Sequence, residues 1–240
     1  MPGLEENVRA VRARIDAAAR DAGRDPASVA LLAVSKTWPA ADVAALAALG
    51  QRDFGENRAQ ELLTKAAEVG GLDVRWHFVG QLQRNKAAAV ARLGAVVHTV
   101  DRESLARALD RAGEQAGRPV DVFVQVDLGG AAGELAARGG AVPADVPALA
   151  DLVAASSGLR LRGLMAVAPR GEDPHPAFDR LAALAARVRS DHPEAVELSA
   201  GMSGDLEAAI AAGATVVRVG TAIFGDRPLP CDGDQISPAT

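Results

Sequence analysis

The sequence predicts an α/β fold: a single (β/α)8 TIM barrel with an additional N-terminal helix. Eight apolar segments of strand type alternate with segments of helical period over about 220 residues. Strands separated by helices pair in parallel through right-handed crossovers, and eight such units fit one closed barrel. An open, doubly wound sheet is the competing fold.

The first two elements are an amphipathic helix and a strand. The helix is predicted from apolar residues that recur at steps of four and three, namely Leu4, Val8, Val11, Ile15 and Ala18. The strand is the apolar run 29–35, and Lys36 follows it directly. The sequence therefore places an amine at the end of the first strand.

The alternation continues to a fifth strand. The predicted elements are helix 40–49, strand 51–55, helix 56–69, strand 74–79, helix 84–92, strand 95–100, a helix through 105–116 and strand 120–126. Asp101 is predicted as the N-cap of the helix before the fifth strand, with Glu103 in its first turn.

Residues 129–145 are rich in glycine and alanine and lack a hydrophobic period, so they predict a long mobile loop. The second half then gives helix 147–157, strand 159–165, helix 174–191, strand 195–199, helix 203–212 and strand 215–219. The barrel is expected to span 1–227. The rest of the Pro-, Gly- and Asp-rich end, 228–240, is expected to be a disordered tail.

Composition excludes several classes of protein. With 49% hydrophobic residues, 24% charged residues and a net charge of −5, the chain is expected to be a globular cytoplasmic protein without a nucleic-acid partner. The single cysteine, Cys231, excludes an internal disulfide, and the four histidines are too far apart for a local zinc motif. There is no signal-peptide core and no apolar run long enough to span a membrane.

In such barrels the functional site lies on the loops that follow the strands. Polar and small residues at those positions form the candidate site: Lys36, Asn57, His77, Met165, Ser199, Ser203, Gly204, Arg218, Gly220 and Thr221. Some have a purely structural interpretation as well. His77, between Trp76 and Phe78, can be a hydrogen-bonded core histidine, and Met165 can be packing. Arg218, set among valines, can belong to a buried ion pair.

Two segments predict a phosphate site. Residues 201–204 (Gly-Met-Ser-Gly) open the helix after the seventh strand, and Gly220-Thr221 opens a short segment after the eighth. Backbone N–H groups and two hydroxyls can converge there on an anion. Glycine suits these positions because a side chain would hold the backbone away from the phosphate oxygens.

A lysine, a phosphate cradle and a buried arginine together match the needs of pyridoxal phosphate (PLP). Its aldehyde forms a Schiff base with a lysine, its phosphate needs N–H donors, and its ring nitrogen needs a partner. Arginine cannot accept a proton, so it keeps the ring nitrogen neutral and the cofactor a weak electron sink. That favours a racemase-like or carrier protein over a transaminase.

Several segments resemble the signature segments of the pyridoxal phosphate homeostasis proteins, the YggS/PROSC family. They are Ala33-Val-Ser-Lys-Thr37, Phe54-Gly-Glu-Asn57, Trp76-His-Phe-Val-Gly-Gln-Leu-Gln-Arg-Asn-Lys86, Leu161-Arg-Gly-Leu-Met165, Gly201-Met-Ser203 and Val217-Arg-Val-Gly-Thr-Ala-Ile-Phe-Gly225. The resemblance runs in order from residue 4 to about 227. It departs at Ala200 and after Val126, where Asp-Leu-Gly-Gly replaces the family's usual segment.

The resemblance implies an alanine-racemase-like barrel that holds PLP on Lys36. By the same resemblance, Arg218 is expected to face the ring nitrogen, and Ser203, Gly220 and Thr221 are expected to surround the phosphate. It also implies a role in vitamin B6 cofactor homeostasis and in amino-acid and keto-acid balance, without established catalysis. The implied partners are PLP and PLP-dependent apo-enzymes, with no membrane, and the chain is expected to be a monomer or weak dimer.

Two enzyme readings compete with this one. The first is an amino-acid racemase of weak activity. Alanine racemases use a tyrosine from a second domain as well as the lysine, whereas this chain has no tyrosine, so His77 or water would have to replace it. The second is a barrel enzyme that acts on a phosphosugar-type substrate through Lys36 without PLP. It needs an acid–base pair that the sequence does not identify.

Overall fold

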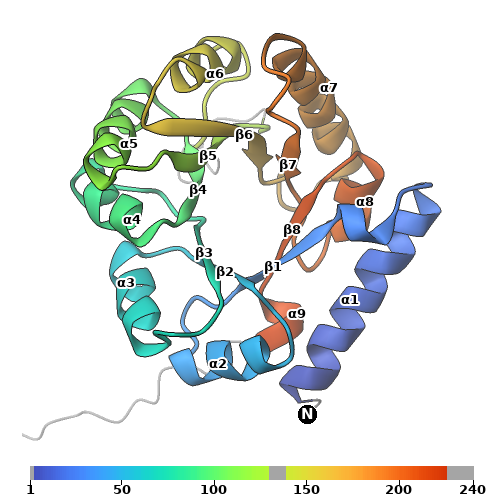
Figure 1. Cartoon of the computed structure of the whole chain (residues 1–240). Helices are drawn as coiled ribbons and strands as arrows, with labels where there is room; N and C mark the ends of the chain where they lie inside the picture. The colour runs from blue at the N-terminus through green and yellow to red at the C-terminus, as the bar shows by residue number, and fades with distance from the viewer. Residues whose placement is uncertain (1–2, 130–138, 226–240) are drawn as a thin grey trace, which may run out of the picture.

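Eight parallel strands close into a barrel in chain order, β1 to β8 (Figure 1). This computed structural model describes residues 3–129 and 139–225. Pairing of β1 with β8, from Ala30 opposite Val216 to Ala33 opposite Val219, closes the ring. The strands are β1 (Ala30–Val34), β2 (Asp53–Glu56), β3 (Arg75–Phe78), β4 (Val96–Val100), β5 (Val120–Val126), β6 (Leu159–Ala166), β7 (Glu197–Ser199) and β8 (Val216–Val219).

Helices follow the strands and surround the barrel (Figure 1). They are α1 (Leu4–Asp21), α2 (Ala40–Ala48), α3 (Ala59–Glu68), α4 (Ala87–Leu93), α5 (Glu103–Ala116), α6 (Val146–Ala154), α7 (His175–Asp191), α8 (Leu206–Ala211) and α9 (Thr221–Phe224), with 3-10 turns η1 (Pro26–Ser28) and η2 (Arg84–Lys86). The predicted (β/α)8 barrel with an extra N-terminal helix is confirmed. The parallel pairing excludes the open sheet, because no strand of the ring is left with a free edge.

Some predicted boundaries are wrong. Asp101 is not the N-cap of α5, since Arg102 takes that position and Asp101 pairs with Arg102 instead. The helix predicted from residue 203 begins at Leu206, because residues 203–205 form a turn. Part of the loop 129–145 and the tail after 225 lie outside the described residues.

Two layers of packing hold the barrel together. Between the sheet and the helices lies the main apolar core, with fully buried side chains such as Leu62, Leu105 and Leu181. Inside the barrel, a smaller cluster of Val96, Phe123 and Met165 fills the space between inward-facing strand positions. The interior also contains buried polar side chains, and these belong to the site described below.

Helix α1 lies across the outside of the barrel beside β1 and β8 (Figure 1). It packs against α2, α8 and α9, and its apolar stripe is buried from Val8 to Ala19. This is the stripe that the four-and-three spacing predicts. In the part of the chain that the structure describes, neither α1 nor any other helix is long and apolar enough to cross a membrane.

Candidate functional site

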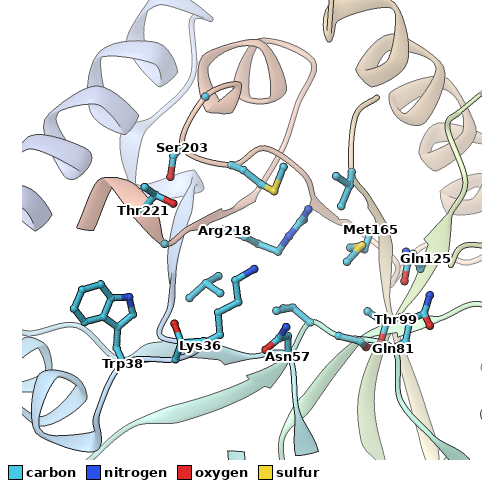
Figure 2. A pocket seen from close by; sticks show the side chains of 18 of the residues that line it. Lys36, Trp38, Asn57, Gln81, Thr99, Gln125, Met165, Ser203, Arg218 and Thr221 are labelled. Atoms are coloured by element: carbon cyan, nitrogen blue, oxygen red, sulfur yellow. Dashed lines mark hydrogen bonds between the residues drawn. The ribbon is translucent and has the colours of Figure 1, made fainter. Parts of the chain in front are cut away.

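A cavity of about 760 Å³ opens at the carboxyl end of the strands, where barrel sites are expected. Its lining includes Lys36, Asn57, Met165, Ser203, Gly204, Arg218, Gly220 and Thr221 from the predicted set (Figure 2). His77 and Ser199 do not line it. The structure therefore brings together residues that lie up to 185 positions apart, from Lys36 to Thr221, in one hollow.

Lys36 lies in the turn that follows β1, and its side chain points into the cavity (Figure 2). The next residue, Thr37, has a φ of 71°. A β-branched residue is strained in that left-handed conformation, so the surroundings must hold it. Glu61 does so, since its Oε1 accepts a hydrogen bond from the Thr37 amide at 2.6 Å.

A buried ion-pair network lies beneath this turn. The Nζ of Lys65 donates to Glu56 Oε1 at 2.7 Å, to Glu61 Oε1 at 2.8 Å and to the Ser35 carbonyl at 2.7 Å. The Ser35 hydroxyl also donates to Glu56, at 2.6 Å. The amine therefore joins β1, β2 and α3 directly under the Lys36 turn.

The two carboxylates of this network differ in pKa. Burial raises the pKa of Glu56 above its ordinary value, and hydrogen bonds from Lys65 and Ser35 offset only part of that rise. Its second oxygen, Oε2, has no hydrogen-bond partner among the described residues. At Glu61 burial acts in the same direction, but hydrogen bonds from Lys65 and the Thr37 amide leave its pKa lowered.

Arg218 carries a guanidinium into the barrel interior and lines the cavity (Figure 2). It donates from Nη1 to Ser199 Oγ at 2.9 Å and from Nη2 to the Ala166 carbonyl at 2.8 Å. Both acceptors are neutral, and in the described part of the chain it forms no salt bridge. The interpretation of Arg218 as half of a buried ion pair is therefore wrong. Burial lowers its pKa to about 10, opposed by the charge of Asp205.

The predicted phosphate cradle lies at the opposite side of the cavity from Met165 (Figure 2). Ser203 and Thr221 are adjacent there, and the amide of Ala222 donates to Ser203 Oγ at 3.3 Å. Gly201 has a φ of 89°, and a Cβ on it would lie 2.7 Å from that of Ala209. At Gly204, by contrast, a Cβ would meet nothing within 4 Å, so this backbone faces open space.

Helix α1 holds both loops of the cradle from outside. Arg14 Nη2 donates to the Ser203 carbonyl at 3.0 Å, and Asn7 Nδ2 donates to the Ile223 carbonyl at 2.8 Å. Arg14 is itself held by Glu207 of α8, at 2.8 Å. Sequence reasoning did not find these residues, because polar residues on the helix flank look like solvent-exposed ones.

The two remaining predicted residues lie deeper in the barrel. His77 is buried and bonded to Asp53 and His98, and Ser199 is buried between His98 and Arg218. Other residues line the cavity without having been predicted: Trp38, Thr99, Gln125 and Met202. Trp38 stacks on Phe224 with ring centroids 5.8 Å apart. The sequence signal that could have identified Trp38 was its position two residues after Lys36.

The fold and cavity together define a class of protein: an alanine-racemase-type barrel whose first strand leads to a lysine and whose last two lead to a cradle. The alanine racemase N-terminal domain matches residues 6–228. Alanine racemase from Streptomyces coelicolor has the same fold, with a TM-score of 0.74 at 23% identity over 94% of this chain and 58% of that one.

Nearer relatives narrow the assignment. The pyridoxal phosphate homeostasis protein of Pseudomonas aeruginosa is 47% identical over 95% of this chain and 97% of its own. PipY of Synechococcus elongatus, solved with PLP bound, is 36% identical with a TM-score of 0.81, over 92% of this chain and 100% of that one. This chain belongs to the pyridoxal phosphate homeostasis protein family.

Proposed function

We propose that this protein binds PLP in the cavity, with Lys36 as the Schiff-base lysine, and takes part in intracellular PLP homeostasis and amino-acid and keto-acid balance. The observation that carries the proposal is that Lys36, Arg218 and the Ser203–Thr221 cradle line one cavity of about 760 Å³. PLP bound to PipY supports the choice of ligand.

Each end of the cavity suits one part of PLP. The backbone of Gly204 and Gly220 and the hydroxyls of Ser203 and Thr221 suit the phosphate. Arg218 suits the ring nitrogen, since a guanidinium with a pKa of about 10 keeps its protons at neutral pH and offers only donors. Met165 suits a flat ring, and Asn57 lies on the same side as Lys36 (Figure 2).

The bound cofactor would supply an aldehyde that reacts with amines and a ring that withdraws electrons. With arginine at its nitrogen the ring stays a weak electron sink. This chemistry supports a protein that stores and releases PLP to PLP-dependent apo-enzymes in the cytoplasm, acting as a monomer or weak dimer without catalysis of its own.

A weak racemase is the second candidate, and Lys36 is the observation that favours it. Racemisation needs a proton donor or acceptor on each face of the bound amino acid. The sequence suggested His77 or water in place of the absent tyrosine, but His77 is buried against His98 and lies outside the cavity lining. The described lining of the cavity therefore contains Lys36 but no histidine.

Absorbance of the purified protein with PLP, followed by borohydride reduction and peptide mass spectrometry, tests the proposal. We expect a visible Schiff-base band and a pyridoxyl group on the Lys36 peptide. Lys36→Ala should remove both and leave the folded circular dichroism spectrum intact, because the side chain is only half buried.

Lys86→Ala is the matched control, since Lys86 is exposed on η2 and outside the cavity lining. It should leave the band and the labelled peptide unchanged. A wild-type protein that stays colourless with PLP would overturn the proposal, and so would a pyridoxyl group that persists after Lys36→Ala. An alanine racemase assay on the loaded protein separates the carrier from the weak enzyme.

A further inference from the structure

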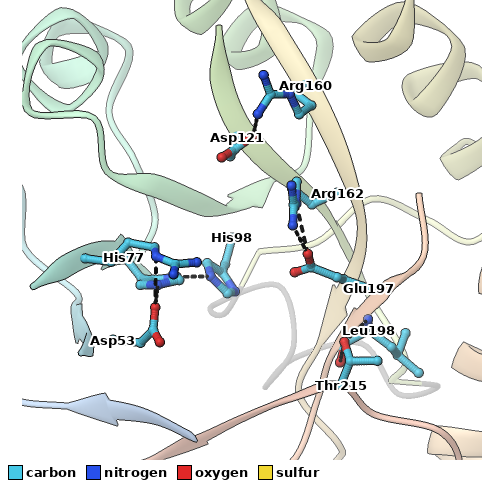
Figure 3. Close-up of polar contacts among 10 residues, drawn as sticks. Asp53, His77, His98, Asp121, Arg160, Arg162, Glu197, Leu198 and Thr215 are labelled. Carbon is cyan, nitrogen blue, oxygen red and sulfur yellow. Dashed lines mark hydrogen bonds and ion pairs between the residues drawn. The ribbon is translucent and has the colours of Figure 1, made fainter. Parts of the chain in front are cut away.

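A continuous chain of hydrogen bonds runs through the barrel interior beneath the cavity. From Arg218 Nη1 it passes to Ser199 Oγ at 2.9 Å, to His98 Nδ1 at 2.9 Å, from His98 Nε2 to His77 Nδ1 at 2.8 Å, and from His77 Nε2 to Asp53 Oδ1 at 2.9 Å. Figure 3 shows the Asp53–His77–His98 part. The residues come from β8, β7, β4, β3 and β2.

The two ends of this chain of hydrogen bonds lie in different surroundings. Arg218 lines the large cavity at the carboxyl end of the strands. Asp53 begins β2 and lines, with His77, a second cavity of about 340 Å³ at the amino end. The Asp53 carboxylate is 22% exposed and also lies 3.3 Å from Arg75. The chain of hydrogen bonds therefore links the two ends of the barrel.

With both imidazoles neutral, these hydrogen bonds have one consistent direction. The guanidinium can only donate, so Ser199 Oγ accepts from it and can donate to His98 Nδ1. A neutral His98 then carries its proton on Nε2 and donates to His77 Nδ1. A neutral His77 in turn donates from Nε2 to the Asp53 carboxylate. Reversing the bonds with neutral rings would turn a bare ring nitrogen toward that carboxylate.

The surroundings of His98 favour the neutral ring. It is wholly buried, and its ring stacks on Phe123 with centroids 4.3 Å apart. Burial lowers the pKa of His98 well below its ordinary value, and the charge of Arg218 acts in the same direction. Asp53, at the other end, has a lowered pKa: burial raises it, but the hydrogen bond from His77 and the charge of Arg75 act against burial.

We propose that Asp53, His77, His98 and Ser199 are positioning residues for Arg218, and that together they set the direction of its guanidinium and couple its charge to a carboxylate at the far end of the barrel. Ordered hydrogen bonds polarise one another in a medium of low dielectric constant, so a distant carboxylate can act through them. The inference rests on the proposed function, because Arg218 is the group expected at the ring nitrogen.

The bond order can be measured without cofactor. Long-range 1H–15N correlation spectra of the PLP-free protein report which nitrogen of each imidazole carries the proton. We expect neutral Nε2–H forms for both His77 and His98 at pH 7. A His98 protonated at Nδ1, or a doubly protonated His77, would overturn the proposed order, whether or not the protein binds PLP.

Coupling along the chain is tested with Asp53→Asn. We expect PLP affinity to fall about tenfold and the absorption maximum to shift, because a neutral amide no longer polarises the chain. Asp121→Asn is the matched control, since Asp121 is the second residue of β5 and lies 3.3 Å from an arginine, Arg160, but has no histidine partner among the described residues (Figure 3). It should change neither quantity.

Ser199→Ala completes a double-mutant cycle, because it interrupts the chain of hydrogen bonds next to Arg218. If the effect of Asp53 travels through Ser199, then Asp53→Asn should change affinity and spectrum little in the Ser199→Ala background. An equal effect in both backgrounds would overturn the proposal, and so would no effect of Asp53→Asn in the wild-type background. Should wild-type protein bind no PLP, the proposed function fails, and the imidazole spectra still decide the bond order.

Discussion

Two buried cations lie near the cavity, and their surroundings differ. Lys65 is held by two carboxylates and a carbonyl within 2.8 Å. Arg218 is held by a hydroxyl and a carbonyl within 2.9 Å, both neutral. A buried charge is costly unless its neighbours compensate it. Lys65 is compensated within the protein, whereas the charge of Arg218 faces the cavity. The balance of charge thus separates a structural cation, Lys65, from the cation that we propose binds the ligand, Arg218.

Removing Lys65 should have the largest effect on stability. Lys65→Met leaves Glu56 buried without its cation, so the free energy of unfolding should fall by about 3–5 kcal/mol in urea titrations. Adding Glu56→Gln should recover much of the loss, because no charge is then left uncompensated. Lys86→Met is the exposed control. A single variant as stable as the wild type would show that the network contributes little.

Replacing Arg218 should have the opposite effect, changing ligand affinity much more than stability. Arg218→Met loses two hydrogen bonds but also removes a desolvated charge, so the free energy of unfolding of PLP-free protein should change by less than about 1.5 kcal/mol. PLP affinity, by equilibrium titration, should fall at least about tenfold. An Arg218→Met variant that unfolds as readily as Lys65→Met, or that binds PLP normally, would contradict the proposed difference between Lys65 and Arg218.

His98, which is linked to Arg218 through Ser199, should make the stability of the protein depend on pH. Because burial lowers the pKa of His98, the unfolded chain binds a proton there that the folded protein does not. The contribution of His98 to stability is therefore present above the pKa of histidine in the unfolded chain, about 6.5, and is lost as pH falls below that pKa. The free energy of unfolding should change by at most about 1.4 kcal/mol per pH unit.

Denaturant titrations between pH 7 and 5 check this expectation. His98→Gln should flatten the slope, whereas His175→Gln, at an exposed histidine, should leave it unchanged. Equal slopes in wild type and His98→Gln would mean that His98 is not the group that titrates.

The smallest effect is expected at Thr37, whose amide is held by the Lys65 network through Glu61. Thr37→Gly should stabilise the protein by about 0.5 to 1 kcal/mol, because glycine adopts a positive φ without strain. Thr37→Ala keeps a Cβ and should bring no such gain in thermal unfolding. A loss of stability in Thr37→Gly would show that the side chain contributes more than the strain costs.

The barrel could be predicted from sequence because its strands are short apolar runs separated by helical periods. Lys36 and the cradle could be predicted because parallel strands bring their carboxyl ends to one face. Arg218 was recognisable as buried from its valine neighbours, but its acceptors were not, since Ala166 and Ser199 come from other strands.

Other features depend on tertiary packing that no local pattern shows. Lys65 shares the buried face of α3 with Leu62 three residues earlier, yet a lysine on a helix ordinarily indicates solvent. His77 was predicted to be in the site because it lies near the end of the third strand. Its ring instead joins a neighbour 21 positions away, at His98, in the barrel interior. The start of α8 shifted because Asp205 accepts the Met202 amide and shapes the turn before the helix.

The bonds from Asn7 and Arg14 of α1 to the carbonyls of Ile223 and Ser203 have a thermodynamic consequence. If an anion at the cradle is bound more tightly when α1 is docked, then by reciprocity the anion must hold α1 on the barrel by the same factor. Amide exchange along α1 would then slow as the cradle fills, so the first helix reports on occupancy of a cavity that it does not line.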